Sequence, residues 1–231
     1  MAAGELTKNR VFEREALVLG VGNILWADEG FGSRAAAAFH EAYLDRPDTL
    51  TADGGTLGFG LMNLIASSRR LLVFDCCELH AEPGTLRVLR EKDVALWTST
   101  KLSPHQTGMS ELLGTAALLG EMPESVAVIG IQPSVLDDYG GSLSPAVRAR
   151  LGEAVALAAA VLAEWGLPHE SRPADRPAAP LTADCLAVAR YEAERPSEED
   201  ACRRGDDRVF MRMPDAAPAV GADRHSSEGR E

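Results

Sequence analysis

Two adjacent carboxylates follow a glycine turn near the start of the chain and could bind a metal or act as a base. The stretch is LGVGNILWADEGFG, residues 19–32, and it places Asp28 and Glu29 where a nucleotide-binding loop would keep its glycines. A dinucleotide site is disfavoured, because the third glycine of GxGxxG is missing and the bulky residues after Gly22 would crowd a pyrophosphate. We therefore consider Glu29 as a metal ligand, with Asp28 as the nearest spare general base.

Two more residues could join Glu29 in a metal site. Asp75 ends the apolar run RLLVFD, and His105 lies in KLSPHQTGMS, which we interpret as a loop before a helix starting near Met109. Two carboxylates and one imidazole make an incomplete ligand set for a divalent transition metal, with positions left for water or for a ligand from a partner.

Each candidate also has a plainer explanation. Glu29 could complement a helix dipole, Asp75 could cap a turn, and His105 could simply be a polar residue exposed on a surface loop. Asp53, in the turn Asp53-Gly54-Gly55, could lie beside the same crevice or simply build a strand-to-helix turn. Only the convergence of Glu29, Asp75 and His105 favours the metal interpretation.

Other chemical motifs are absent or weak. The sequence has no GxSxG elbow, no HExxH and no Walker lysine. Its four cysteines, Cys76, Cys77, Cys185 and Cys202, contain no CxxC pair, so we expect thiols, with the two beside Asp75 serving as packing. Asp137 and Asp138 precede Tyr-Gly-Gly, which is typical of a turn, and Ser144-Pro145 favours a helix start.

The elements that must position these residues alternate along the chain. Short apolar runs predict strands at residues 16–21, 49–53, 70–75, 85–89 and 125–131. Helical patterns lie between and after them, at residues 29–43, 58–67, 109–119 and 145–165. This order favours an open, mostly parallel sheet with helices on both faces. Ligands bind outside the carboxyl ends of such strands, which is where Glu29, Asp75 and His105 are expected.

Composition limits the partners and the domain organisation. The 231 residues carry a net charge of −12, which argues against nucleic acid or an anionic membrane as the main partner. We find no signal-like start and no apolar run of membrane-spanning length, so we expect a cytoplasmic protein.

We expect an N-terminal extension at 1–15, a catalytic α/β domain at 16–166, and a largely disordered extension at 167–231. Two apolar islands in that extension, CLAVARY and RVFMRM, could pack back on the domain.

Five motifs together resemble the hydrogenase maturation endopeptidases, and within them those serving uptake-type nickel–iron hydrogenases. The motifs are GNILWADEGFG, DGGTLGFGLM, LLVFDCCELHAEPGTL, SPHQTGMSELL and IGIQPSVLDDYGGSLS. The resemblance runs from about residue 17 to 165 and resumes weakly at DCLAVARYE. It implies a three-layer α/β/α sandwich with a twisted, mostly parallel five-stranded sheet.

The resemblance also implies an activity and a ligand set. Members of this family remove a C-terminal peptide from the hydrogenase large subunit precursor after nickel insertion. Their metal-binding Glu, Asp and His fall on Glu29, Asp75 and His105, with nickel supplied by the precursor. We expect a monomer that binds this precursor. One alternative is a nickel-binding accessory protein without protease activity, and a second is an unrelated metal-dependent hydrolase of the aminopeptidase kind, which would cleave generic peptides.

Overall fold

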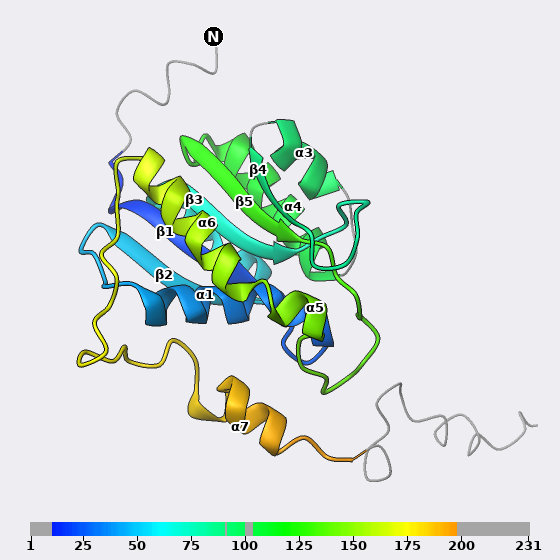
Figure 1. Cartoon of the computed structure of the whole chain (residues 1–231). Coiled ribbons are helices and arrows are strands. Elements are labelled where there is room, and N and C mark those ends of the chain that lie inside the picture. Colours follow the sequence, from blue (N-terminus) through cyan, green and yellow to red (C-terminus); the bar gives the residue numbers. More distant parts are fainter. Residues whose placement is uncertain (1–10, 91, 100–103, 198–231) are drawn as a thin grey trace, which may run out of the picture.

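The computed structural model describes residues 11–90, 92–99 and 104–197, and within helices α3 and α4 it describes only the backbone of residues 95, 96, 98, 99 and 104–108. Its centre is a five-stranded sheet in the order β2-β1-β3-β5-β4 (Figure 1). Four strands are parallel: β1 (Arg14–Val21), β2 (Thr49–Gly55), β3 (Ser68–Cys76) and β5 (Ser125–Ile131). The fifth, β4 (Leu86–Arg90), pairs antiparallel with β5 at one edge. The predicted α/β fold is confirmed.

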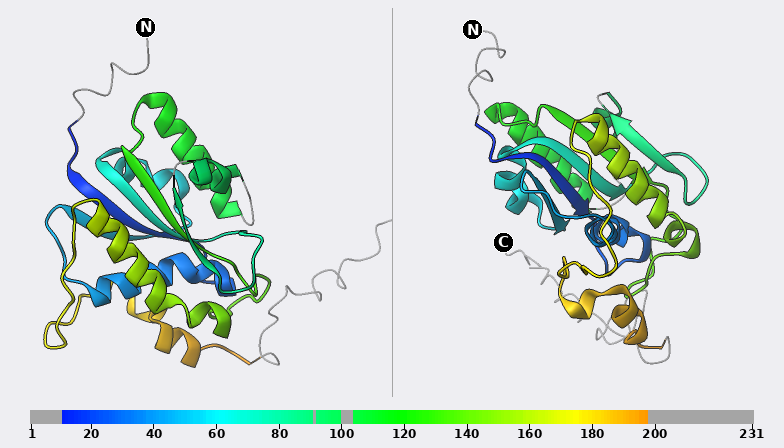
Figure 2. Two further views of the ribbon diagram at one scale, coloured as in Figure 1. Left: turned by 45° about the horizontal axis from the view of Figure 1, so that its top comes forward. Right: turned by 60° about the vertical axis from the view of Figure 1, so that its left-hand side comes forward.

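Helices cover both faces of the sheet (Figure 2). The first face packs against α1 (Phe31–Ala42), α5 (Pro145–Arg148) and α6 (Leu151–Glu164). The second packs against the short helices η2 (Gly58–Leu61) and α2 (Met62–Ala66), together with α3 (Lys92–Ser99) and α4 (Pro104–Leu119). No helix in the described residues is long and apolar enough to cross a membrane.

Strand β3 shows how the apolar run RLLVFD produces both layers. Successive side chains of a strand point to opposite faces. Leu72 and Phe74 accordingly belong to the core under α1 and α6, while Leu71 and Val73 belong to the core under α3 and α4. Asp75 continues the second series, so the alternation directs its carboxylate toward the α3 and α4 layer.

The helix predictions needed three corrections. Helix α4 begins at Pro104 rather than near Met109, so His105 lies in its first turn and not in a loop; proline is favoured at this point because its missing N–H has no helical partner there. The long helix predicted at 145–165 is two helices, α5 and α6. Helix α3 was not predicted at all, and its buried Val94 and Trp97 are spaced i, i+3.

Helix α1 approaches the sheet closely because glycine stands at the contact. A Cβ atom on Gly32 would lie 2.1 Å from the carbonyl oxygen of Val21 and 2.3 Å from that of Phe74. Both distances are far inside van der Waals contact, and both neighbours are backbone atoms that cannot rotate away. Glycine at position 32 therefore sets the distance between α1 and the ends of β1 and β3.

Substituting Gly32→Ala is expected to lower the free energy of unfolding by about 1–3 kcal/mol or more, the usual cost of forcing extra atoms into a packed core. Gly152→Ala is the matched control, because Gly152 is exposed in α6 and an added Cβ would meet no atom within 4 Å. The control should leave stability unchanged or raise it by up to about 1 kcal/mol through helix propensity. Urea unfolding of both variants checks the prediction, and equal stabilities would contradict it.

After α6 the chain returns along the domain before forming η3 (Asp184–Leu186) and α7 (Val188–Ala193). Backbone bonds from Leu44 N–H to Glu170 O and from Arg172 N–H to Ala42 O anchor this return. In Figures 1 and 2 helix α7 lies beside α1 and α5. In the island CLAVARY, Leu186 and Tyr191 contact Arg34 of α1, although no residue of η3 or α7 is buried; the island RVFMRM lies outside the described residues.

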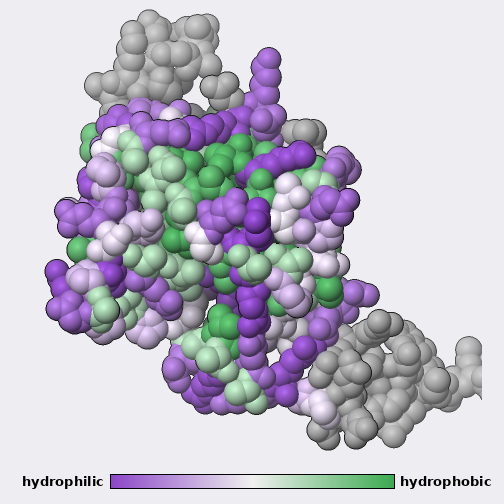
Figure 3. All heavy atoms as spheres, in the orientation of Figure 1, coloured by the Kyte–Doolittle hydropathy of each residue, from purple (hydrophilic) through white to green (hydrophobic). Residues whose placement is uncertain are grey.

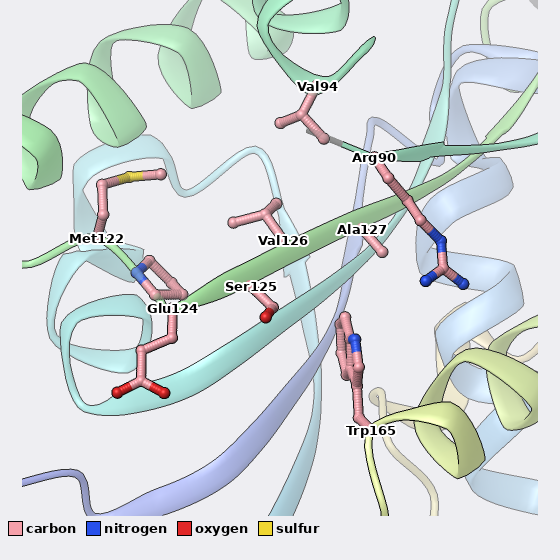
Figure 4. Close-up of a pocket in the computed structure, with 9 residues that line it drawn as sticks. Arg90, Val94, Met122, Glu124, Ser125, Val126, Ala127 and Trp165 are labelled. Atoms are coloured by element: carbon pink, nitrogen blue, oxygen red, sulfur yellow. The ribbon is translucent and has the colours of Figure 1, made fainter. Parts of the chain in front are cut away.

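The amino edge of the sheet holds a cavity of about 360 Å³ (Figure 4). It lies where β5 begins at Ser125 and α6 ends beside Trp165. Arg90 lines it and forms an ion pair with Glu164 at 2.6 Å. Figure 3 shows hydrophobic side chains gathered on the upper part of the same face of the molecule, bordered by hydrophilic ones. This cavity is at the opposite end of the strands from the candidate site.

Candidate functional site

The turn after β1 places Glu29 over the end of that strand. Gly22 has a φ of +138°, and a Cβ there would lie 1.9 Å from the carbonyl oxygen of Glu29, so the turn can close only on glycine. The N–H of Gly22 donates to Gly55 O at 3.0 Å, which ties the turn to the end of β2. The chain then forms η1 (Ala27–Gly30), on which Glu29 is half-buried.

Asp28, the residue before Glu29, is fully buried, and its carboxylate accepts four hydrogen bonds. Its Oδ2 accepts from the N–H groups of Ser134 and Val135 at 2.8 and 2.9 Å and from the Ser144 hydroxyl at 2.9 Å. Its Oδ1 accepts from the Ser144 N–H at 2.7 Å. The Asp28 N–H in turn donates to Val135 O at 3.1 Å. This carboxylate therefore fastens residues 132–144, which we name the 132–144 loop, to the turn that carries Glu29.

Other contacts join the same two segments. The N–H of Gly140 donates to Leu25 O at 2.7 Å. The rings of Trp26 and Tyr139 meet edge to face, with centroids 5.1 Å apart. Ser144 also caps α5, where its hydroxyl accepts from the Val147 N–H, as the Ser-Pro pair predicted. The 132–144 loop and the Glu29 turn thus form one connected unit.

Asp75 lies at the carboxyl end of β3 and is fully buried. The indole Nε1–H of Trp97, on α3, donates to Asp75 Oδ2 at 2.8 Å. Trp97 also lines a cavity of about 380 Å³ between α3 and the residues after β3. A buried indole donor of this kind fixes the plane of the carboxylate it contacts.

The elements that carry Glu29 and Asp75 contact one another at the carboxyl edge of the sheet. Helix η1 contacts β3, and the charges of both carboxylates act on Cys76. Burial raises the pKa of the Cys76 and Cys77 thiols, and the negative charge of Asp75 raises both further. Because a neutral thiol is a poor nucleophile, this fits the interpretation of both cysteines as packing.

His105 is placed at the same edge by its backbone alone. Helix α4 leads into β5, which begins at the amino edge, so the first turn of α4 lies at the carboxyl edge. The His105 side chain lies outside the described residues. Among the described side chains no group of three His, Cys, Asp or Glu residues could hold a metal ion, so the predicted ligand set is described for Glu29 and Asp75 only.

Asp53 builds a turn and ties it to α1. Its Oδ1 accepts from the Ser33 hydroxyl at 2.6 Å and from the Gly55 N–H at 3.0 Å. Gly55 has a φ of +43°, and the pairing of β1 with β2 skips Gly54. Asp53 therefore holds the end of β2 against the start of α1, which agrees with the plainer of its two explanations.

The sequence interpretation missed Trp97 and the role of Ser144. Trp97 lies in EKDVALWTST, where Val94 and Trp97 supply a short i, i+3 signal for a helix that was not recognised. Ser144 was recognised as a helix start, but its contact with Asp28 joins residues 116 positions apart. No local pattern reports such a contact.

The chain is similar throughout its fold to proteins that mature hydrogenases. The family model described as hydrogenase maturation protease matches residues 33–161. The hydrogenase expression/formation protein HoxM of Cupriavidus necator is 43% identical over 197 residues, covering 84% of this chain and 97% of the relative. The hydrogenase 2 maturation protease of Escherichia coli is 35% identical over 152 residues, covering 65% and 92%.

A solved structure of a hydrogenase-maturing protease has the same fold as this chain. The hydrogenase maturating endopeptidase HybD from Escherichia coli has a TM-score of 0.65 and 33% identity, over 68% of this chain and 98% of that chain. The α/β sheet with a candidate site at its carboxyl edge is thus the fold of a peptidase. The chain belongs to the hydrogenase maturation protease family, and it is a protease.

Proposed function

We propose that this protease removes the C-terminal peptide from the nickel-loaded large subunit precursor of a nickel–iron hydrogenase. Glu29, Asp75 and His105 complete the coordination of the nickel that arrives with the precursor, so the metal is part of the substrate. The observation that supports the proposal is that η1, which carries Glu29, contacts β3, which carries Asp75, and that the backbone of the first turn of α4 lies at the same edge of the sheet.

The donor set suits this role. Nickel accepts imidazole nitrogen and carboxylate oxygen together, and zinc or a similar divalent ion can substitute in such a set. Three protein donors leave coordination positions for groups of the precursor. A precursor without nickel would lack the centre that these donors recognise, so cleavage would follow nickel insertion.

The bound nickel can polarise the scissile carbonyl or acidify a water molecule. The residues of this chain orient the substrate around it. Trp97 holds the Asp75 carboxylate in one plane, and the glycine turn fixes Glu29 over the end of β1. Asp28 is less suited to act as the general base than we expected, because its oxygens already accept four hydrogen bonds in a buried site.

The variant Trp97→Phe tests the support of Asp75. It removes the Nε1–H donor but keeps an aromatic ring in the core. We expect processing to fall by roughly 10–100-fold, the usual effect of losing the hydrogen-bond partner of a metal ligand. Trp165→Phe, at the far cavity, is the control and should process the precursor normally. Equal processing rates for the two variants would show that Trp97 does not support the function of Asp75.

The function itself is tested by the intact mass of the purified precursor, with and without nickel, before and after addition of this protein. Loss of a C-terminal peptide only from the nickel-loaded sample is the expected result. Cleavage of nickel-free precursor would contradict recognition through the metal. An unchanged mass together with a stable complex would favour the alternative of an accessory protein that binds the metal without cutting.

We further propose that the protein acts as a monomer in the cytoplasm. The support is the acidic net charge of −12 and the buried Cys76 and Cys77, which are thiols outside any disulfide and suit a reducing compartment. Light scattering at micromolar concentration, alone and with precursor, measures the oligomeric state, and cell fractionation measures the compartment.

A further inference from the structure

The last described segment of the chain, residues 184–195, contacts the 132–144 loop through charged side chains. We name this segment the strap. Arg195 Nη2 lies 2.6 Å from Asp138 Oδ1, and both side chains are mostly buried. Glu192 Oε1 accepts from the Ser142 hydroxyl at 2.5 Å, and both carboxylate oxygens accept from Arg148 at the end of α5. The strap therefore holds the loop at two places.

The other end of the strap is fastened to α1. The guanidinium of Arg34 is buried and donates to the carbonyl oxygen of Leu186. It also lies 5.2 Å from the centre of the Tyr191 ring, within the range of a cation–π interaction. Burial lowers the pKa of Arg34, while the nearby Tyr191 and Asp53 act in the opposite direction. The strap thus bridges the start of α1 and the 132–144 loop.

The loop continues this connection to the candidate site. It donates three backbone N–H groups and one hydroxyl to Asp28, and its Gly140 N–H bonds to Leu25 O. Asp28 and Leu25 belong to the turn that carries Glu29. An unbroken series of contacts therefore runs from Arg195 and Glu192, through the loop, to Glu29.

We propose that the strap is a positioning element that keeps the 132–144 loop, and through it the Glu29 turn, in the conformation that receives the substrate. Arg195 and Glu192 are its positioning residues. The expected effect of the strap on catalysis rests on the proposed function, whereas its expected effect on the conformation of the Glu29 turn does not. If only part of the population has an ordered turn, the apparent affinity for substrate falls in proportion to that part.

The experiment uses the full-length chain with Arg195→Ala and Glu192→Ala combined. Hydrogen exchange is measured for peptides covering residues 22–30 and 132–144, together with KM and kcat on the nickel-loaded precursor. Arg190→Ala is the matched control, because Arg190 forms its ion pairs with Asp184 and Glu194 inside the strap itself. The exchanged pair Asp138→Arg with Arg195→Asp tests whether the contact, rather than the residue types, matters.

We expect exchange in both peptides to rise about fivefold or more in the combined variant, which corresponds to a modest loss of local stability. KM should rise by a similar factor with kcat little changed, and the exchanged pair, in which Glu192 is unchanged, should keep exchange and KM near their wild-type values. Unchanged exchange at residues 22–30 would overturn the strap proposal, even if the wild-type protein cuts the precursor. If the combined variant exchanges faster but the wild-type protein does not cut the precursor, the strap proposal holds and the proposed function is rejected.

Discussion

Replacing Glu29 with glutamine is expected to abolish processing of the nickel-loaded precursor while the protein stays folded. The substitution keeps the size of the side chain and removes its charge. Loss of a hydrogen-bond partner of a metal ligand already costs roughly 10–100-fold, so loss of the ligand should cost at least about 100-fold. Intact mass of the precursor against time gives the rate, and thermal unfolding reports the fold.

The matched control is Glu41→Gln, which neutralises an exposed glutamate on α1, the helix that follows the Glu29 turn. It should process the precursor at the wild-type rate. Complex formation with the nickel-loaded precursor separates two causes: if Glu29 is a ligand, the variant loses binding together with cleavage. A Glu29→Gln protein that cuts normally would reject the ligand assignment.

Asp28→Asn is expected to destabilise the domain by about 1–3 kcal/mol, because each buried donor left without an acceptor costs that much. Both oxygens of Asp28 face donors, so one side of an asparagine would present its own N–H₂ group to an N–H or hydroxyl. Whichever way the amide turns, at least one of these hydrogen bonds is lost. Denaturant unfolding measures the loss.

The exposed Asp137→Asn is the control and should change stability by no more than about 0.5 kcal/mol, as surface substitutions usually do. This experiment also separates the two roles considered for Asp28. A fastening role predicts reduced stability and faster hydrogen exchange in the 132–144 loop. A general base would instead lose kcat at unchanged stability, and that result would contradict the structural assignment.

Sequence periodicity predicted the sheet well because each strand carries its own signal. The residues predicted as strands at 70–75 and 125–131 lie within β3 and β5, since a strand buried on both faces must be continuously apolar. Helix ends were less accurate. The break between α5 and α6 interrupts one continuous amphipathic pattern, and the beginning of α4 depended on whether Pro104 opened the helix or preceded it.

The partners of the candidate residues could not be predicted in the same way. Trp97 reaches Asp75 from a helix 22 positions away, and Ser144 reaches Asp28 across 116 positions. Contacts of this kind depend on how layers pack and not on any local spacing. The same holds for the strap, because its contacts with Arg34, Asp138 and Arg148 join residues that are far apart in the sequence.

The sequence by itself determined the order of strands and helices, the edge at which Glu29, Asp75 and His105 are placed, and the family, because local periodicity and motif order suffice for all three. Only the tertiary structure distinguished the two adjacent carboxylates of the DEG motif. Burial and four donors give Asp28 a fastening role, while Glu29, one residue later, is half-buried on a short helix that contacts β3. Neighbours in sequence differ here because what each side chain faces is decided by distant segments that pack around it.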